Sequence, residues 1–377
     1  GQRWHLMKYL GIAGNYLLMM FYTCISGWMV IYFVKYLNGS ILSAQGDAAL
    51  GAVFGDMIGN TWLVLGATLA AIVICFLICS LGLQKGVERI TKWMMVALFV
   101  LMVGLAIYSL TLDNAAEGLK FYLVPSFERM QEAGLGTVIS AAMGQAFFTL
   151  SIGIGSIAIF GSYINKERRL LGEAVTIVSL DTSVALMSGL IIFPACFTYD
   201  LEVGAGPGLL FNTMATVFRN MNGGRIWGSL FFLFMVFAAF STVLAVFENI
   251  LACVREMTGW SRPKGCLICG IGLLITSTTT ALGYNVLSDF HPFAPDSAML
   301  DLWDFIVSYN LLPLGALVFT IFCCNKRYGW GWENMLREAN NGKGLQVKNW
   351  MKPIFCYVVP AAIIIIYVMG LVTFKWR

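Results

Sequence analysis

Charged residues are scarce in this chain. Only 12% of its 377 residues are Asp, Glu, Lys or Arg, whereas 59% are hydrophobic, and the mean hydropathy is +0.78. A water-soluble globular domain usually carries about 25% charged residues. The composition therefore excludes a soluble globular protein and indicates a chain that crosses a membrane several times.

Residues for catalysis or metal chemistry are also few. The chain has two histidines, His5 and His291, and both lie outside the long apolar runs. It contains no HExxH, GxSxG or glycine-rich phosphate loop. Most of the ten cysteines lie in apolar runs, which favours buried free thiols over a disulfide framework. We therefore expect no enzyme, and nothing in the distribution of charge predicts nucleic-acid binding.

Nine long apolar segments follow one another along the chain, each near the roughly 20 residues that a membrane-spanning helix needs. They cover residues 9–37, 61–83, 93–112, 136–163, 172–198, 226–257, 265–285, 302–325 and 353–374. We predict an all-α, multi-pass membrane protein with a single transmembrane domain over residues 1–377 and only short helices or loops between the spans. If the first span starts in the cytoplasm, most Lys and Arg residues lie on the cytoplasmic side, as membrane topology favours.

The fourth segment carries its own interruption, the run TLSIGIGS at residues 149–156. Two glycines and three hydroxyl side chains are poor residues for the interior of a helix. In lipid every backbone amide needs a partner, so a broken helix is stable only where it lines a cavity inside the protein. The freed carbonyl groups can bind a cation and the freed amide groups an anion. We therefore predict that this break is the binding site of a secondary transporter.

Few ionisable residues lie within the apolar segments, where each costs about 2.5–3.5 kcal/mol at the centre of a helix. Asp181 lies in the fifth segment, and Glu248 lies in the inner half of the sixth. Asp301 and Asp304 lie at the outer end of the eighth segment, and Glu256 at the inner end of the sixth, where solvation at the interface explains them equally well.

A second polar cluster, the run AAFST at residues 238–242, lies in the sixth segment. Hydroxyls on a backbone of small residues commonly serve helix packing in membranes. The same oxygens, together with a backbone carbonyl one turn earlier, can also bind an alkali cation. The spacing alone does not decide between these two roles.

Three motifs resemble the neurotransmitter:sodium symporters, the LeuT-like sodium-coupled amino acid transporters. They are QAFFTLSIGIG at 145–155, AAFST at 238–242 and GPGLLF at 206–211, and the resemblance extends along the whole chain. It implies the LeuT fold with its inverted repeat, alternating access around the break at 149–156, and a place in the cell membrane. The nine segments correspond to family helices three to eleven, so the resemblance implies the bacterial branch and the absence of the first two helices from this sequence. It also implies a monomer or weak dimer of prokaryotic origin.

The resemblance assigns two sodium sites. Thr149 and Asp181 correspond to ligands of the first Na⁺ ion. The Ala238 carbonyl, Ser241 and Thr242 correspond to ligands of the second. Most members have asparagine at the position of Asp181, and animal members bind chloride nearby. We expect Asp181 to replace that anion and make transport independent of chloride. The alternative is a protonated acid bonded to a neighbour.

The resemblance also assigns a substrate pocket and two gates. Tyr22 corresponds to the residue that binds the substrate carboxylate, and Phe148 to the lid above the substrate. The remaining pocket positions are Leu18, Ile25, Ser151, Ile154, Gly155, Val243 and Val246. Asp304 corresponds to the outer gate, and Tyr163 with Glu256 to the inner gate. The mostly aliphatic lining predicts a bulky hydrophobic or aromatic amino acid as substrate.

Three alternatives stay open at this point. An exchanger or permease of the same fold from another family would lack the hydroxyl pair of Ser241 and Thr242. A channel needs a continuous pore lined by several polar helices, whereas the polar groups here lie on two helices and Asp181. A homologue that does not transport is the third.

Overall fold

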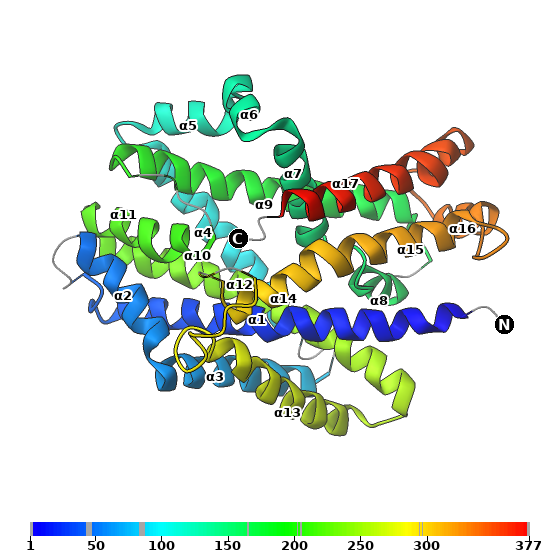
Figure 1. The fold of residues 1–377 in the computed structure, drawn as a ribbon, viewed down its shortest axis with the longest axis horizontal. Helices are drawn as coiled ribbons and strands as arrows, with labels where there is room; N and C mark the ends of the chain where they lie inside the picture. Colours follow the sequence, from blue (N-terminus) through cyan, green and yellow to red (C-terminus); the bar gives the residue numbers. More distant parts are fainter. Residues whose placement is uncertain are drawn as a thin grey trace.

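The computed structural model describes residues 3–42, 47–82, 87–163, 166–201, 203, 206–293, 295 and 297–374. Apart from one isolated bridge between Arg168 and Lys343, every regular element in these ranges is a helix. The long helices lie side by side along the longest axis of the molecule (Figure 1). The predicted all-α class is confirmed.

Eight of the described helical segments are long and apolar enough to cross a membrane. They are α1 (Met7–Leu37), α3 (Thr61–Ser80), α4 (Arg89–Leu110), α9 (Leu170–Thr198), α12 (Gly224–Thr258), α13 (Arg262–Ala281), the run of α14 (Met299–Asp304), η4 (Phe305–Leu311) and α15 (Leu312–Cys324), and the run of η5 (Asn349–Met351), η6 (Ile354–Val358) and α17 (Val359–Thr373). The remaining predicted span is split into α7 (Leu135–Thr149) and α8 (Ser156–Tyr163). All nine predicted segments are therefore helical, and the fourth is broken where its sequence predicts.

Short helices fill the connections, as the lengths of those connections predict. They are α2 (Asp47–Gly59), α5 (Ala115–Leu123), α6 (Phe127–Ala133), α10 (Gly206–Gly208), η3 (Leu209–Thr213), α11 (Met214–Asn220) and α16 (Trp332–Ala339). In Figure 1, α2 and α11 lie at one end of the bundle and α16 lies at the other.

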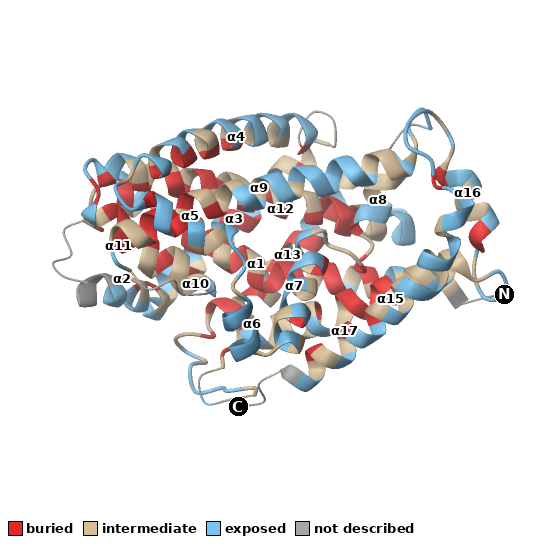
Figure 2. Ribbon diagram, turned by 90° about the horizontal axis from the view of Figure 1, so that it is seen from above, coloured by how far each residue is buried: buried red, intermediate tan, exposed pale blue. Residues whose placement is uncertain are grey.

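The core lies where α1, α3, α12 and α13 pack together. Side chains of α1 and α12 are buried along much of both helices (Figure 2). Trp28, Tyr32 and Tyr36 of α1 meet Phe211 and Phe232 in edge-to-face, tilted and stacked ring contacts. Such pairs add about 0.5–1.5 kcal/mol each beyond the burial of their area. These four helices form a packed support beside the broken helix.

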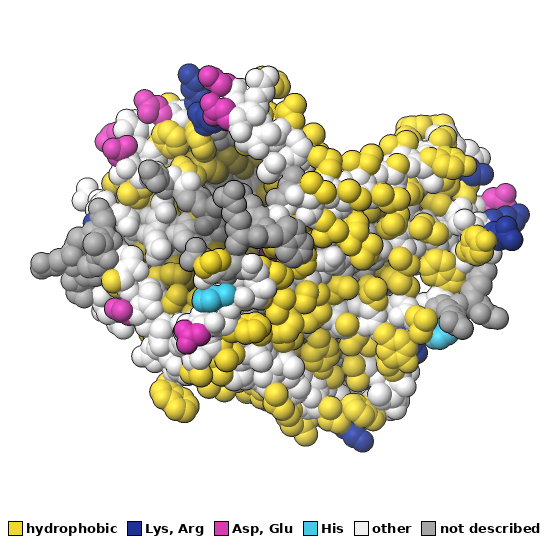
Figure 3. Space-filling model, viewed as in Figure 1, with side chains coloured by type: hydrophobic (Ala, Val, Ile, Leu, Met, Phe, Trp, Pro, Cys, Tyr) yellow, Lys and Arg dark blue, Asp and Glu magenta, His cyan; other side chains and the backbone are white. Residues whose placement is uncertain are grey.

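The outer surface of the bundle is hydrophobic. Leu77 of α3, Leu180 of α9 and Ile275 of α13 expose 62%, 63% and 67% of their surface. In the space-filling view, hydrophobic side chains cover a broad area between two ends where charged side chains gather (Figure 3). An apolar surface this wide would make a soluble protein aggregate. It fits helices that face lipid.

At Gly153 the break packs closely against the backbone of α15. A Cβ atom added to Gly153 would lie 2.1 Å from the Leu312 carbonyl oxygen, and one added to Gly315 would lie 2.1 Å from the Gly153 carbonyl oxygen. Glycine at both positions therefore permits a contact that no side chain could fit. This contact fixes the position of the break relative to α15.

We expect the substitution Gly315→Ala to destabilise the protein, because its methyl group must displace the Gly153 backbone. Overpacking of this kind typically costs about 1–3 kcal/mol. The midpoint of thermal unfolding of the purified protein in detergent measures the effect. Gly104→Ala in α4 is the matched control, because a Cβ atom there meets open space. A Gly315→Ala midpoint equal to that of the control would contradict the expectation.

Candidate functional site

The chain between α7 and α8 leaves the regular helical hydrogen-bond pattern at Ser151 and resumes it in α8. Ser151, Gly153 and Gly155 have φ angles of +49°, +103° and +81°. The Ser151 amide donates to the Phe148 carbonyl at 3.0 Å and the Ile152 amide donates to the Phe147 carbonyl at 3.1 Å, in place of the α-helical pattern. A positive φ is rare for a residue other than glycine, so Ser151 is held in a strained conformation. The predicted loss of the helical ladder is confirmed.

Asn15 of α1 supplies partners for the broken backbone. Its side-chain amide donates to the Ile154 carbonyl at 3.0 Å and to the Gly11 carbonyl at 2.7 Å. Its side-chain oxygen accepts from the Ser156 hydroxyl at 3.0 Å. Asn15 is 1% exposed. The motifs in the sequence do not single out Asn15, although an asparagine inside an apolar segment is itself a signal.

Thr149 and Asp181 lie together, as the resemblance implies. The Thr149 hydroxyl, at the end of α7, donates to a carboxylate oxygen of Asp181 in α9 at 2.8 Å. The C-terminal end of a helix carries partial negative charge and unpaired carbonyl groups, which favour a cation. Hydroxyl, carboxylate and carbonyl oxygens are the ligands that hard cations prefer. The pair therefore has the chemistry of a cation site.

Three more oxygens cluster within one turn of α12. The Ala238 carbonyl accepts from the Ser241 hydroxyl at 2.8 Å and from the Thr242 hydroxyl at 3.2 Å. The Thr242 side chain also lies near the Tyr22 hydroxyl of α1. Both hydroxyls are half-buried, so an ion could replace the bonds they make within their own helix. Among the described residues no group of three or more His, Cys, Asp or Glu side chains could hold a transition metal.

Eight of the nine predicted substrate residues come from α1, α12 and the break, which meet, and the ninth, Phe148, lies in α7. Leu18, Tyr22 and Ile25 are spaced four and three residues apart and share one face of α1. Val243 and Val246 are buried in α12, which packs along α1. The remaining three, Ser151, Ile154 and Gly155, lie in the break, and the Ile154 side chain packs tightly over Gly14 of α1.

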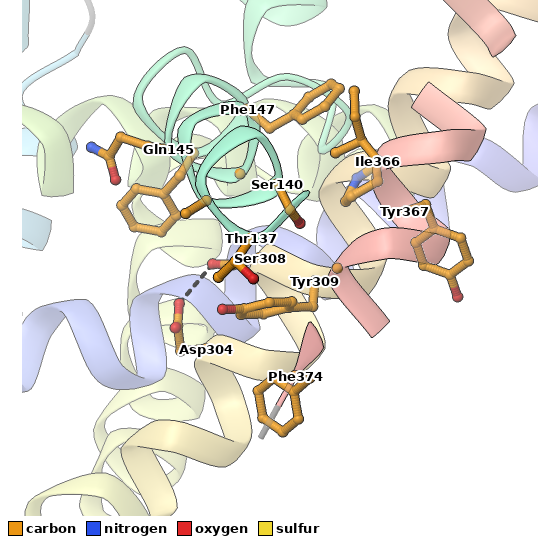
Figure 4. Close-up of a pocket in the computed structure, with 15 residues that line it drawn as sticks. Thr137, Ser140, Gln145, Phe147, Asp304, Ser308, Tyr309, Ile366, Tyr367 and Phe374 are labelled. Atoms are coloured by element: carbon orange, nitrogen blue, oxygen red, sulfur yellow. Dashed lines mark hydrogen bonds between the residues drawn. The ribbon is translucent and has the colours of Figure 1, made fainter. Parts of the chain in front are cut away.

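A cavity of about 550 Å³ lies on the other side of the break, between α7, the α14–η4–α15 run and α17 (Figure 4). Phe148 and Asp304, the predicted lid and outer gate, both line it. The predicted pocket residues of α1 and α12 do not line it. The Asp304 carboxylate accepts a hydrogen bond of 2.6 Å from the Ser308 hydroxyl.

At the inner end, the predicted gate residues Tyr163 and Glu256 are both exposed, and within the described ranges no hydrogen bond or ion pair joins them. The main charged contact near Tyr163 is instead between Glu248 and Arg262. The Arg262 guanidinium binds both carboxylate oxygens of Glu248, one of them at 3.0 Å, and donates to the Cys79 carbonyl at 2.7 Å. This pair connects α12 and α13 to the end of α3. It gives a structural reason for an ionisable residue, Glu248, within an apolar segment.

A bundle of apolar helices around a broken helix, with hydroxyl, carboxylate and carbonyl oxygens gathered on α7, α9 and α12, is an arrangement typical of secondary transporters. A family model described as "Sodium:neurotransmitter symporter family" matches residues 55–377. The chain belongs to the sodium:neurotransmitter symporter family. It is a multi-pass membrane transporter and not an enzyme, and sodium dependence is the property by which its relatives are named.

Two curated relatives and one solved structure illustrate the match. The chain is 34% identical to the uncharacterized sodium-dependent transporter YhdH of Bacillus subtilis, over 98% of this chain and 81% of YhdH. It is 28% identical to an uncharacterized sodium-dependent transporter of Haemophilus influenzae, over 98% of this chain and 79% of the relative. The crystal structure of MhsT in complex with L-phenylalanine is 33% identical, with a TM-score of 0.86, over 98% of this chain and 82% of the MhsT chain. The expected family and fold are confirmed.

We expect Asn15→Ala to lower the stability of the protein, because the Ile154 carbonyl and the Ser156 hydroxyl lose a buried partner. A buried group left without its partner typically costs about 1–3 kcal/mol. The thermal unfolding midpoint in detergent measures the loss, and substitution of the exposed Asn341 by alanine is the control. Equal midpoints for the two variants would show that Asn15 does not support the break.

Proposed function

We propose that the chain couples the entry of Na⁺ to the entry of a bulky hydrophobic or aromatic amino acid, by alternating access around the break between α7 and α8. The observation that carries the proposal is the interrupted helix with Thr149 and Asp181 paired at its edge. The likeness to MhsT, whose structure holds L-phenylalanine, supports the choice of substrate class. Membership in the family removes the alternative of a permease from another family.

The proposed sodium ligands form two sets. Thr149 and Asp181 bind the first ion at the end of α7. The Ala238 carbonyl, Ser241 and Thr242 bind the second ion on α12. Tyr22 lies beside the second set, because its hydroxyl is near the Thr242 side chain. A hydroxyl that holds the substrate carboxylate would thus lie next to a sodium ligand, which gives a physical basis for coupling the two solutes.

The proposed substrate pocket selects an apolar side chain. Leu18, Ile25, Ile154, Val243 and Val246 offer aliphatic surface, and Phe148 closes the pocket from the cavity side. Ser151 and Gly155 contribute the backbone of the break, which can pair with the amino and carboxylate groups. None of these side chains carries a charge that would pair with an acidic or basic substrate.

The driving force is large enough for concentrative uptake. One charge that crosses ~100 mV gains about 2.3 kcal/mol, and a tenfold sodium gradient adds about 1.4 kcal/mol. The sum of ~3.7 kcal/mol per ion can concentrate a zwitterion about 400-fold. A second ion would square this limit.

We expect the protein expressed from its gene, in proteoliposomes, to take up labelled L-leucine when an inward Na⁺ gradient is applied. Thr242→Val should raise the Na⁺ concentration for half-maximal uptake about tenfold, because the loss of one ligand costs on the order of 1.4 kcal/mol. Thr198→Val is the matched control, since that hydroxyl is also half-buried and also bonds a carbonyl four residues earlier.

The same assay tests the substrate class. Unlabelled leucine or tryptophan should compete better than glycine or aspartate. Uptake that persists when choline replaces Na⁺, or no uptake at all, would refute sodium-coupled transport. Stronger competition by glycine or aspartate would refute only the choice of an apolar substrate.

We expect uptake to be independent of chloride, because Asp181 places a fixed negative charge beside the first sodium site. Replacing chloride with gluconate should leave the wild-type rate unchanged. Asp181→Asn should lower the apparent sodium affinity, and chloride should restore part of it, whereas Asp289→Asn in an exposed connection should change neither. A several-fold fall in wild-type uptake in gluconate would contradict this role for Asp181.

A further inference from the structure

Seven residues between α14 and α15 are wound as a π-helix, η4 (Phe305–Leu311). A π-helix is wider than an α-helix and usually occurs as a short insertion within one, often at functional sites. Asp304, which lines the outer cavity, directly precedes η4. Leu312, whose carbonyl contacts Gly153 of the break, directly follows it. The π-helix η4 thus connects Asp304, at the cavity, to Leu312, at the break.

Two side-chain hydrogen bonds involve η4, one within it and one from α17. The Asn310 side-chain amide donates to the Phe305 carbonyl at 3.1 Å. The Tyr367 hydroxyl of α17 donates to the side-chain oxygen of Asn310 at 3.3 Å. Both residues are half-buried, and Tyr367 lines the cavity. Two hydrogen bonds in series therefore join α17 to the backbone of η4.

A hydrogen bond from the first half of η4 orients the Asp304 carboxylate. Ser308 lies inside η4, and its hydroxyl donates to the Asp304 carboxylate at 2.6 Å. Figure 4 shows this bond at the edge of the cavity, near the rings of Tyr309 and Phe374. The direction of the carboxylate thus depends on the winding of the residues that follow it.

Leu312, which directly follows η4, packs against Gly153 of the break. Removal of the extra residue of a π-helix rotates the residues that follow by about 100° and shifts them by about 1.5 Å along the axis. Leu312 and Gly315 would move by this amount, and their backbone lies directly against that of Gly153. Close-packed backbone cannot absorb such a shift, so the break must move with α15.

We propose that η4 links the position of Asp304 to the conformation of the break, and that Ser308, Asn310 and Tyr367 are positioning residues that hold η4 in its π form. The part of this proposal that concerns transport rests on the proposed function. The physical link between η4 and the break does not.

Hydrogen–deuterium exchange of the full chain in detergent tests the link. Tyr367→Phe, which removes one oxygen atom, should speed amide exchange in residues 305–311 by about threefold or more. Exchange in residues 149–156 should also rise, although Tyr367 forms no hydrogen bond with them. Tyr357→Phe, which alters an exposed tyrosine in the same transmembrane segment, is the matched control and should change neither peptide. Faster exchange in 305–311 with no change in 149–156 would overturn the link.

A double variant tests whether the two hydrogen bonds act in series. Asn310→Leu removes both bonds, so adding Tyr367→Phe to it should cause no further change in exchange. If the two substitutions have additive effects on exchange, the two hydrogen bonds do not act in series. If Asn310→Leu does not fold, the single variant Tyr367→Phe still decides the question, because it leaves the Asn310–Phe305 bond in place.

Uptake of labelled L-leucine tests the transport part separately. Ser308→Ala and Tyr367→Phe should lower the maximal rate several-fold and leave the Na⁺ concentration for half-maximal uptake within about twofold, because neither residue is a proposed sodium ligand. An unchanged maximal rate in both variants would refute the positioning roles. Absence of uptake by the wild-type protein would refute the proposed function, and the exchange measurements would still confirm or refute the link.

Discussion

The structure depends on finding hydrogen-bond partners for a backbone that has left its helix in the middle of a membrane. An unpaired amide or carbonyl group in hydrocarbon costs several kcal/mol, so an irregular segment between α7 and α8 could not face lipid. Asn15 pairs with the Ile154 carbonyl, and the Gly153 backbone lies directly against α15. Because α1 and α15 cover the break in this way, the freed groups at the end of α7 can serve ligands.

The support for the break comes from two sides with different character. On one side α1 packs with α3, α12 and α13 around large aromatic side chains, and the Glu248–Arg262 pair fastens three of these helices at the inner end. On the other side lie a cavity, a π-helix and α17, with fewer buried side chains. A well-packed side and a hollowed side are what a transporter needs if one half is to move against the other.

The sequence predicted much of this arrangement because the relevant signals are local. Apolar length predicted the nine spans, and glycines among hydroxyls in residues 149–156 predicted the break. The pairing of Thr149 with Asp181 came from the resemblance and lies where it was expected.

Contacts between distant segments were not predictable from local pattern, which is why Asn15 and the partner of Glu248 were missed. The π-helix η4 was missed because its residues are as apolar as those of a regular helix. The cavity lies apart from the expected pocket residues of α1 and α12, because its wall is formed by α7, the α14–η4–α15 run and α17.

The buried contact between Glu248 and Arg262 has a consequence for how the chain can change over generations. Loss of one partner leaves a solitary charge in an apolar interior, which costs about 3–5 kcal/mol, whereas exchange of both for apolar residues of similar volume is often tolerated. A substitution at either position alone therefore strongly destabilises the folded protein. The two positions must change together or not at all. Descendants of this gene should keep or discard the pair as a unit, even though 13 other residues separate the two in the chain.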